Sequence, residues 1–453
     1  MSSLLIKNAD TLVTCDNQDS VLHNVNVYCK DGVIADISTQ EHAADEVLDA
    51  TGYFLYPGLI NTHHHLYQYF TRNIPKVQNM ELFDWLKTLY EIWKRLDEET
   101  VYLSSLAGMG ELMRYGCTTC LDHHYVFPKA ASGALIDAQF AAADALSIRM
   151  HATRGSMSLS KKDGGLPPDS VVQDVDAILK DSVRLIETFH DKSDYAMRQM
   201  ALAPCSPFSV TAELLRESAI LARSYGVRLH THLCETKDEE AYMLETRGMR
   251  PYDYMESVGW TGSDVWYAHG IYLNDTELER MAQNGTGVAH CPASNMKLSS
   301  GVCRVPDMLR LGVSLGLAVD GSASNDCSNL LSEIRTAYLL HRLTYGKDAP
   351  TGYDLLKVAT RGSAKILGRE KLGQIAEGFG ADAFLIKKNR LDMVGAELDP
   401  KNLFGTVGYH RPVDYTIVNG RIRVRDRALV GIDEDRVLER GRANINKLLE
   451  AAT

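Results

Sequence analysis

The sequence predicts an α/β protein, a (β/α)8 TIM barrel that carries a small β-sandwich domain built from both chain ends. Three observations lead to this prediction. Extended segments rich in Val, Ile, Leu and Thr occupy both ends of the chain. Between them, short apolar runs alternate with helical stretches, which is typical of a parallel sheet. These runs number eight, as many strands as close a TIM barrel.

The two chain ends are predicted to form a single sandwich. Asp-Gly and Thr-Gly turns interrupt the first end, and the last end contains an Asn-Gly hairpin signal. The extended segments lie at residues 4–15, 25–38, 46–58, 381–389 and 413–429. Because both ends are β-rich and flank a middle of another kind, we expect residues 1–58 and 371–453 to meet in space.

The middle of the chain, residues 59–370, is predicted to form the barrel. Its apolar runs cover residues 60–65, 118–124, 148–156, 200–207, 227–235, 265–270, 287–295 and 314–322. Helical stretches such as 100–115 and 210–226 separate them. Nearly every run ends in a polar side chain. Barrels of this kind keep their active site at the carboxyl ends of the strands, so the chemistry is expected there.

Composition narrows the class of protein. The chain has 453 residues, is 45% hydrophobic and carries a net charge of -11, which argues against binding nucleic acid through a basic face. No apolar run reaches the roughly 18 residues of a membrane span, and the N-terminus lacks the pattern of a secretory signal. Nine scattered cysteines favour reduced thiols. We therefore expect a cytoplasmic protein without nucleic acid or membrane partners.

Two histidines separated by one residue end the first predicted barrel strand. His63 and His65 occur in the run PGLINTHHH, and side chains two residues apart on a strand point to the same side. Both can therefore reach one ion, while His64 faces elsewhere. Imidazole nitrogen suits ions such as Zn²⁺ or Fe²⁺. This motif alone leaves open a histidine cluster on a surface or at a helix cap.

The fifth run ends in HTHLCE and brings two more groups to the same rim. His230 and His232 share a face of the strand, and Glu235 follows where the strand gives way to a loop. His232 adds an imidazole and Glu235 adds a carboxylate. We expect His230 to be a hydrogen-bonded strand residue rather than a ligand.

Two further polar side chains end later runs. His269 ends the sixth run, and Asp320 lies in the last run, after its apolar residues and before a Gly-Ser turn. Asp320 could instead cap the next helix, but the histidines already expected at this rim favour a metal-binding role. A catalytic metal site needs protein ligands and an open position for water. Glu235 and His269 then remain to handle protons.

These motifs resemble those of the amidohydrolase superfamily, in its branch of deaminases with one metal ion. The motifs are PGLINTHHH, HTHLCE, YAHG, AHCPASNMKL and LAVDGSASND, and the resemblance covers essentially the whole chain. It implies one divalent ion per subunit, zinc or alternatively ferrous iron, bound by His63, His65, His232 and Asp320. It also implies that Glu235 shuttles a proton and that His269 and Asp320 orient the hydrolytic water.

Other runs, from HHHLYQYFTR to HCPASNMKLSSG, resemble those of 8-oxoguanine deaminases. This resemblance implies hydrolysis of a free purine-like base, 8-oxoguanine, to urate and ammonia, with Gln68 and Arg154 holding the heterocycle. The residues leave open a backbone-bonded amide for Gln68 and an ion pair for Arg154. Isoxanthopterin, guanine and triazines are alternative substrates of the same site, and an inactive scaffold is a remote alternative. We also expect a homo-oligomer.

Overall fold

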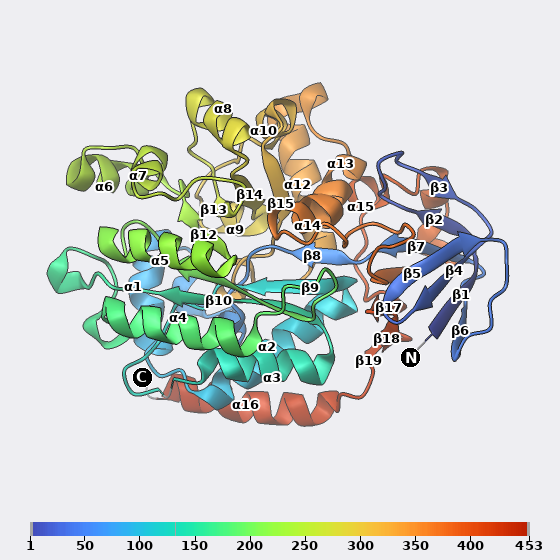
Figure 1. The fold of residues 1–453 in the computed structure, drawn as a ribbon, viewed down its shortest axis with the longest axis horizontal. Coiled ribbons are helices and arrows are strands. Elements are labelled where there is room, and N and C mark those ends of the chain that lie inside the picture. The colour runs from blue at the N-terminus through green and yellow to red at the C-terminus, as the bar shows by residue number, and fades with distance from the viewer. Residues whose placement is uncertain (1–2, 132, 451–453) are drawn as a thin grey trace.

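The structure is a computed structural model that describes residues 3–131 and 133–450. A barrel surrounded by helices lies beside a β-rich region that contains the N-terminus (Figure 1). The predicted fold class, a (β/α)8 barrel with a sheet-rich second region, is confirmed.

Within the described residues, eight parallel strands form the barrel in the order of the sequence. They are β8 (Leu59–Asn61), β9 (Cys117–Asp122), β10 (Arg149–Ser156), β11 (Arg198–Pro204), β12 (Arg228–Leu233), β13 (Val265–His269), β14 (Gly287–His290) and β15 (Ser314–Leu317). The ring closes where the amide of Thr62 donates to the carbonyl oxygen of Leu317 at 3.2 Å. All the carboxyl ends therefore meet at one mouth.

The barrel strands are buried on both faces, which explains their nearly continuous apolar runs. Every residue of β9 and of β13 is buried. One apolar cluster joins side chains of neighbouring strands, among them Ile60, Leu121 and Trp266. This packing gives the residues at the strand ends a rigid support.

Helices follow the strands and cover the outside of the barrel (Figure 1). Side chains cap several of them; Asp97, for example, accepts a hydrogen bond from the amide of Thr100 at 2.8 Å. No helix in the described ranges is long and apolar enough to cross a membrane. The helices are α1 (Leu82–Trp93), α2 (Glu98–Arg114), α3 (Leu135–Leu146), α4 (Val175–Phe189), α5 (Ala212–Tyr225), α6 (Lys237–Arg247), α7 (Pro251–Ser257), α8 (Asp275–Asn284), α9 (Pro292–Lys297), α10 (Val305–Leu311), α11 (Ser322–Asn325), α12 (Leu330–Tyr345), α13 (Gly352–Lys357) and α14 (Ser363–Ile366).

The two chain ends build two further sheets with strand orders β5-β4-β1-β6 and β19-β18-β17-β16-β7-β2-β3. The two ends meet directly where β7 pairs antiparallel with β16. Leu4, Val27, Leu55 and Ile417, which come from both sheets, share one core. The strands are β1 (Ser3–Ala9), β2 (Thr11–Val13), β3 (Val21–Leu22), β4 (Val25–Lys30), β5 (Val33–Ser38), β6 (Glu46–Asp49), β7 (Tyr53–Pro57), β16 (Ala383–Lys387), β17 (Tyr415–Val418), β18 (Arg421–Arg425) and β19 (Ala428–Leu429).

After the last strand the chain returns to the barrel as helix α16 (Glu434–Glu450). This helix lies along the barrel helix α2 (Figure 1). Lys447 pairs with Asp97 at 2.6 Å, and Arg440 pairs with Glu99 at 2.9 Å. Both contacts connect α16 to the start of α2.

Candidate metal centre and active site

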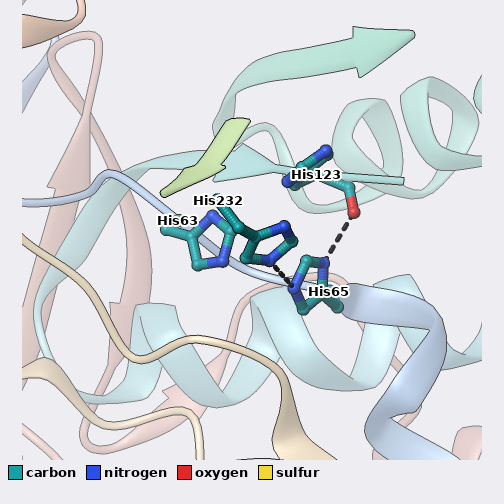
Figure 2. Close-up of side chains that lie close together, drawn as sticks. All are labelled: His63, His65, His123 and His232. Carbon is teal, nitrogen blue, oxygen red and sulfur yellow. Dashed lines mark hydrogen bonds between the residues drawn. The ribbon is translucent and has the colours of Figure 1, made fainter. Parts of the chain in front are cut away.

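The four side chains predicted to bind metal lie together at the mouth of the barrel. His63 and His65 follow β8, His232 lies in β12, and Asp320 follows β15. The Nε2 atoms of His63 and His65 each lie 3.3 Å from Oδ1 of Asp320. Nε2 of His65 lies 3.1 Å from Nε2 of His232, the contact dashed in Figure 2.

The hydrogen bonds of two of these histidines reveal which ring nitrogens face the centre. Nδ1 of His65 lies 2.7 Å from the carbonyl oxygen of His123, and Nδ1 of His232 lies 2.6 Å from that of Cys205. A carbonyl oxygen only accepts, so each Nδ1 carries a proton. Burial holds the pKa of both rings below the usual value, so the rings are neutral and their Nε2 atoms are bare.

Two bare nitrogens 3.1 Å apart cannot share a hydrogen bond, and their lone pairs repel. A cation between them would remove that repulsion. The donor set of imidazole nitrogens and one carboxylate oxygen is the set that Zn²⁺ or Fe²⁺ prefers. The residues at the barrel mouth therefore fit a divalent metal ion.

Asp320 is held as an anion. Burial alone would raise its pKa, but the contact with His63 and the charge of His269 bring the net pKa well below the usual value. Its Oδ2 accepts hydrogen bonds from the hydroxyls of Ser294 at 2.5 Å and Ser324 at 3.1 Å. These bonds orient Oδ1 toward the histidines.

The backbone is strained at two of the predicted site residues. Asp320 has a φ of 63° and His269 a φ of 73°, a left-handed region that residues other than glycine rarely adopt. The amide of Asp320 donates to the carbonyl oxygen of His63 at 3.2 Å, which fixes the turn after β15. Such strain gathers at functional sites.

His123, which was not predicted from the sequence, joins the same cluster (Figure 2). It groups with His63, His65 and His232, with one possible ligand atom from each within 4.8 Å of the others. Its Nε2 lies 2.8 Å from the carbonyl oxygen of Ala203 and therefore donates. Its Nδ1 is buried and has no hydrogen-bond partner in the described part of the chain. The signal in the sequence was the His-His pair that ends the second apolar run.

Glu235 and His269, which the sequence predicts to handle protons, lie beside the predicted metal ligands. Oε2 of Glu235 lies 3.5 Å from Nε2 of His269. Burial raises the pKa of Glu235. Burial lowers the pKa of His269, but the charges of Glu235 and Asp320 outweigh it and the net pKa is raised. Oδ1 of Asn295 accepts a hydrogen bond from Nδ1 of His269 at 2.8 Å, which directs Nε2 of His269 toward Glu235.

A cavity opens above these groups and is lined by His65, Gln68, Leu82, Trp85, Leu86, Tyr125, Cys205, Ser206, Phe208, His232, Glu235, His269, Leu298, Asp320 and Ser324. Gln68, predicted to hold the substrate, is among them. A Cβ at Gly321 would collide with the Gln68 amide oxygen, so this glycine makes room for the amide. Trp85 lines the same cavity.

The structure does not place Arg154, which the sequence predicts to hold the substrate, among the residues that line this cavity. Arg154 donates from Nε to Asp181 at 2.6 Å and from Nη2 to Gln173 at 2.9 Å. Its guanidinium also lies 3.7 Å from the ring centre of Phe127. Asp181 belongs to helix α4, so Arg154 points from β10 toward the surrounding helices. The ion pair that the sequence left open is the arrangement present.

Comparison with known proteins assigns the chain to a family. The model of the amidohydrolase family matches residues 54–423. 8-Oxoguanine deaminase of Pseudomonas aeruginosa is 47% identical over 401 residues, which cover 88% of this chain and 89% of that protein. Hydroxydechloroatrazine ethylaminohydrolase of Pseudomonas sp. strain ADP is 39% identical over 450 residues, which cover 96% of this chain and 93% of that protein.

A solved structure agrees with this assignment. Atrazine chlorohydrolase from Arthrobacter aurescens, complexed with zinc, superposes with a TM-score of 0.94 at 31% identity. The match covers 98% of this chain and 100% of that one. Because the family model spans most of the sequence and the barrel carries a cluster fit for a metal ion, the chain belongs to the amidohydrolase family and is a hydrolase.

Proposed function

We propose that the protein is a deaminase that hydrolyses a free purine-like base, 8-oxoguanine, to urate and ammonia, with one zinc ion per subunit. The observation that carries the proposal is the convergence of His63, His65, His232 and Asp320 beside Glu235 and His269. The two sequence relatives described above, a deaminase and an ethylaminohydrolase, support hydrolysis of a carbon–nitrogen bond.

The chain's own residues can carry both protons of such a reaction. A divalent ion, when bound, lowers the pKa of water toward about 7 and supplies hydroxide at neutral pH. Glu235 accepts the water proton and donates it to the ring nitrogen next to the carbon that bears the amine. His269 orients the water and, with Glu235, carries the second proton to the amine, which leaves as ammonia while a carbonyl remains. The raised pKa of Glu235 suits a reversible proton carrier.

Gln68 and Trp85 are the proposed contacts to the base. Both line the cavity, and the Gln68 amide atoms and the Trp85 indole nitrogen find no hydrogen-bond partner among residues 3–131 and 133–450. A buried polar group without a partner costs about 1–3 kcal/mol, so a ligand that supplies the missing partners is favoured. A ring edge with adjacent carbonyl and N–H groups, as in 8-oxoguanine, complements them.

A triazine amine is the second candidate substrate. The ethylaminohydrolase relative spans more of this chain than the 8-oxoguanine deaminase does, and the same metal ligands and proton carrier would serve both reactions. The two substrates differ in the edge that they present to Gln68. The assay must therefore compare the two substrates directly.

An amine-release assay tests the proposal. Purified, zinc-loaded protein is incubated with 8-oxoguanine, guanine, isoxanthopterin and an ethylamino-hydroxytriazine, and the Glu235→Gln variant serves as the control. We expect the highest kcat/KM for 8-oxoguanine, with urate and ammonia formed in equal amounts. Faster turnover of the triazine would favour the second candidate. No turnover of any substrate above the control would refute the proposed function.

A further inference from the structure

His230 lies beneath the metal centre without belonging to the ligand set. It stands two residues before His232 in β12 and is completely buried. Its Nε2 lies 2.7 Å from Nδ1 of His63, and its Nδ1 lies 2.9 Å from the carbonyl oxygen of Trp266. Its ring also stacks on the Trp266 indole, with 4.6 Å between ring centres and 17° between planes. Both ring nitrogens are thus occupied by protein partners.

These contacts fix the position of each proton. The Trp266 carbonyl oxygen only accepts, so Nδ1 of His230 carries a proton. Nε2 of a neutral His230 is then bare and accepts the hydrogen bond from His63, whose proton therefore sits on Nδ1. The remaining nitrogen of His63, Nε2, is left bare and lies 3.3 Å from Oδ1 of Asp320, at the centre.

The group that fixes the ring proton of His63 differs from the groups that fix the ring protons of His65 and His232. Backbone carbonyl oxygens fix the proton positions of His65 and His232, and no substitution removes a backbone carbonyl. The proton position of His63 instead depends on a side chain that substitution can change. A single replacement can therefore free His63 to move its proton to Nε2, which would block metal binding by that nitrogen.

We propose that His230 is a positioning residue that receives the Nδ1 proton of His63 and thereby keeps Nε2 of His63 available to the metal ion. The inference rests on the metal centre of the proposed function and adds a residue to it. Trp266 anchors the arrangement, because its indole N–H donates to the carbonyl oxygen of Thr62 at 3.2 Å, next to His63. The backbone and the side chains thus connect β13, β12 and the end of β8.

Two substitutions separate this role from mere packing. His230→Phe retains a flat ring that can stack on Trp266 but offers His63 no acceptor. His230→Gln retains an acceptor and a donor on one side chain. His151→Gln is the matched control, since His151 is a buried histidine of strand β10 with no hydrogen-bond partner in the described ranges.

The measurement is the Zn²⁺ dissociation constant of each purified apoprotein by competition with a chromophoric chelator, without substrate. Loss of a group that orients a ligating histidine typically weakens metal binding about 10–100-fold. We expect that loss for His230→Phe, recovery toward the wild-type constant for His230→Gln, and no change for His151→Gln. His230→Leu replaces His230→Phe if the latter does not fold.

The outcomes separate this inference from the proposed function. Wild-type zinc affinity in both His230→Phe and His230→Leu would overturn the inference and leave the metal centre intact. Weak binding in His230→Gln equal to that in His230→Phe would also overturn it, because packing alone would then explain the loss. A wild-type protein that binds no zinc would overturn the metal centre and the inference together.

Discussion

Glu235 is the side chain on which turnover is expected to depend most directly. It lines the cavity and lies 3.5 Å from His269, but it is not among the residues grouped as possible metal ligands in the described chain. Replacing it with Gln removes a proton carrier, and general acid–base catalysis contributes about 10²–10⁴-fold to rate. Glu235→Gln should lose kcat by that factor and keep its zinc, measured by steady-state kinetics and metal analysis. A variant with nearly normal kcat would contradict the assigned role.

Arg154 is expected to matter for stability and not for substrate binding. Its buried guanidinium bonds to Asp181 and Gln173, outside the cavity. Hydrogen bonds to charged groups contribute about 1.5–3 kcal/mol each, so Arg154→Met should lower the free energy of unfolding by about that much. The KM of the folded variant should stay at the wild-type value. A large rise in KM with unchanged stability would instead show that Arg154 binds the substrate.

The contrast between these residues shows how far single positions could be predicted. The gathering of His63, His65 and His232 was predictable because the carboxyl ends of barrel strands meet at one mouth, although His63 and His65 lie just beyond β8 and not within it. Arg154 was not, because the sequence does not reveal which alternate set of residues in β10 faces the barrel interior. His123 was not predicted although it lies near the end of a predicted strand, because consecutive residues of a strand face opposite sides and a His-His pair does not reveal which ring faces the centre.

A buried ion pair joins the barrel to the sheets formed by the chain ends. Arg149 begins β10, and its Nε donates to Asp382, just before β16, at 2.7 Å. The two side chains are 0% and 2% exposed. Removing one partner of a buried pair costs about 3–5 kcal/mol, so Asp382→Ala should lower the free energy of unfolding by that amount in denaturant titrations.

The control for this substitution is an exposed pair in the same region. Glu41 pairs with Lys7 at 2.6 Å, and their side chains are 64% and 33% exposed. Exposed pairs contribute about 0–1 kcal/mol, so Glu41→Ala should hardly change stability. Equal effects of Asp382→Ala and Glu41→Ala would show that the buried pair does not join the two parts.

The strands were easier to predict than the last helix. The alternation of apolar runs with helical stretches was sufficient to predict the eight barrel strands. The β-rich chain ends predicted the additional sheets. Helix α16 was not anticipated, because its sequence is polar and contains Gly441. Its few buried contacts, such as Leu448, depend on the neighbouring α2. We propose residues 1–58 with 371–453, and 59–370, as the two domains, with α16 as the part of the first that packs on the second.

For the whole molecule, metal binding should govern stability as well as activity. Bare imidazole nitrogens crowd around Asp320, and an ion that binds only the folded state stabilises it. At a free concentration 1,000 times Kd the gain is about 4 kcal/mol. Dialysis against a chelator should therefore abolish turnover and lower Tm, and added Zn²⁺ should restore both. An unchanged Tm and full activity after complete removal of metal would contradict this. The homo-oligomer and the cytoplasmic location stay predictions from the sequence.

The metal centre itself is tested most directly by anomalous diffraction from crystals of the zinc-loaded protein, recorded on both sides of the zinc absorption edge. We predict one strong peak, about 2.0–2.2 Å from Nε2 of each ligating histidine and from the Asp320 carboxylate, at the site formed by His63, His65, His232 and Asp320. A zinc peak elsewhere in the molecule, with none among these four side chains, would contradict the account.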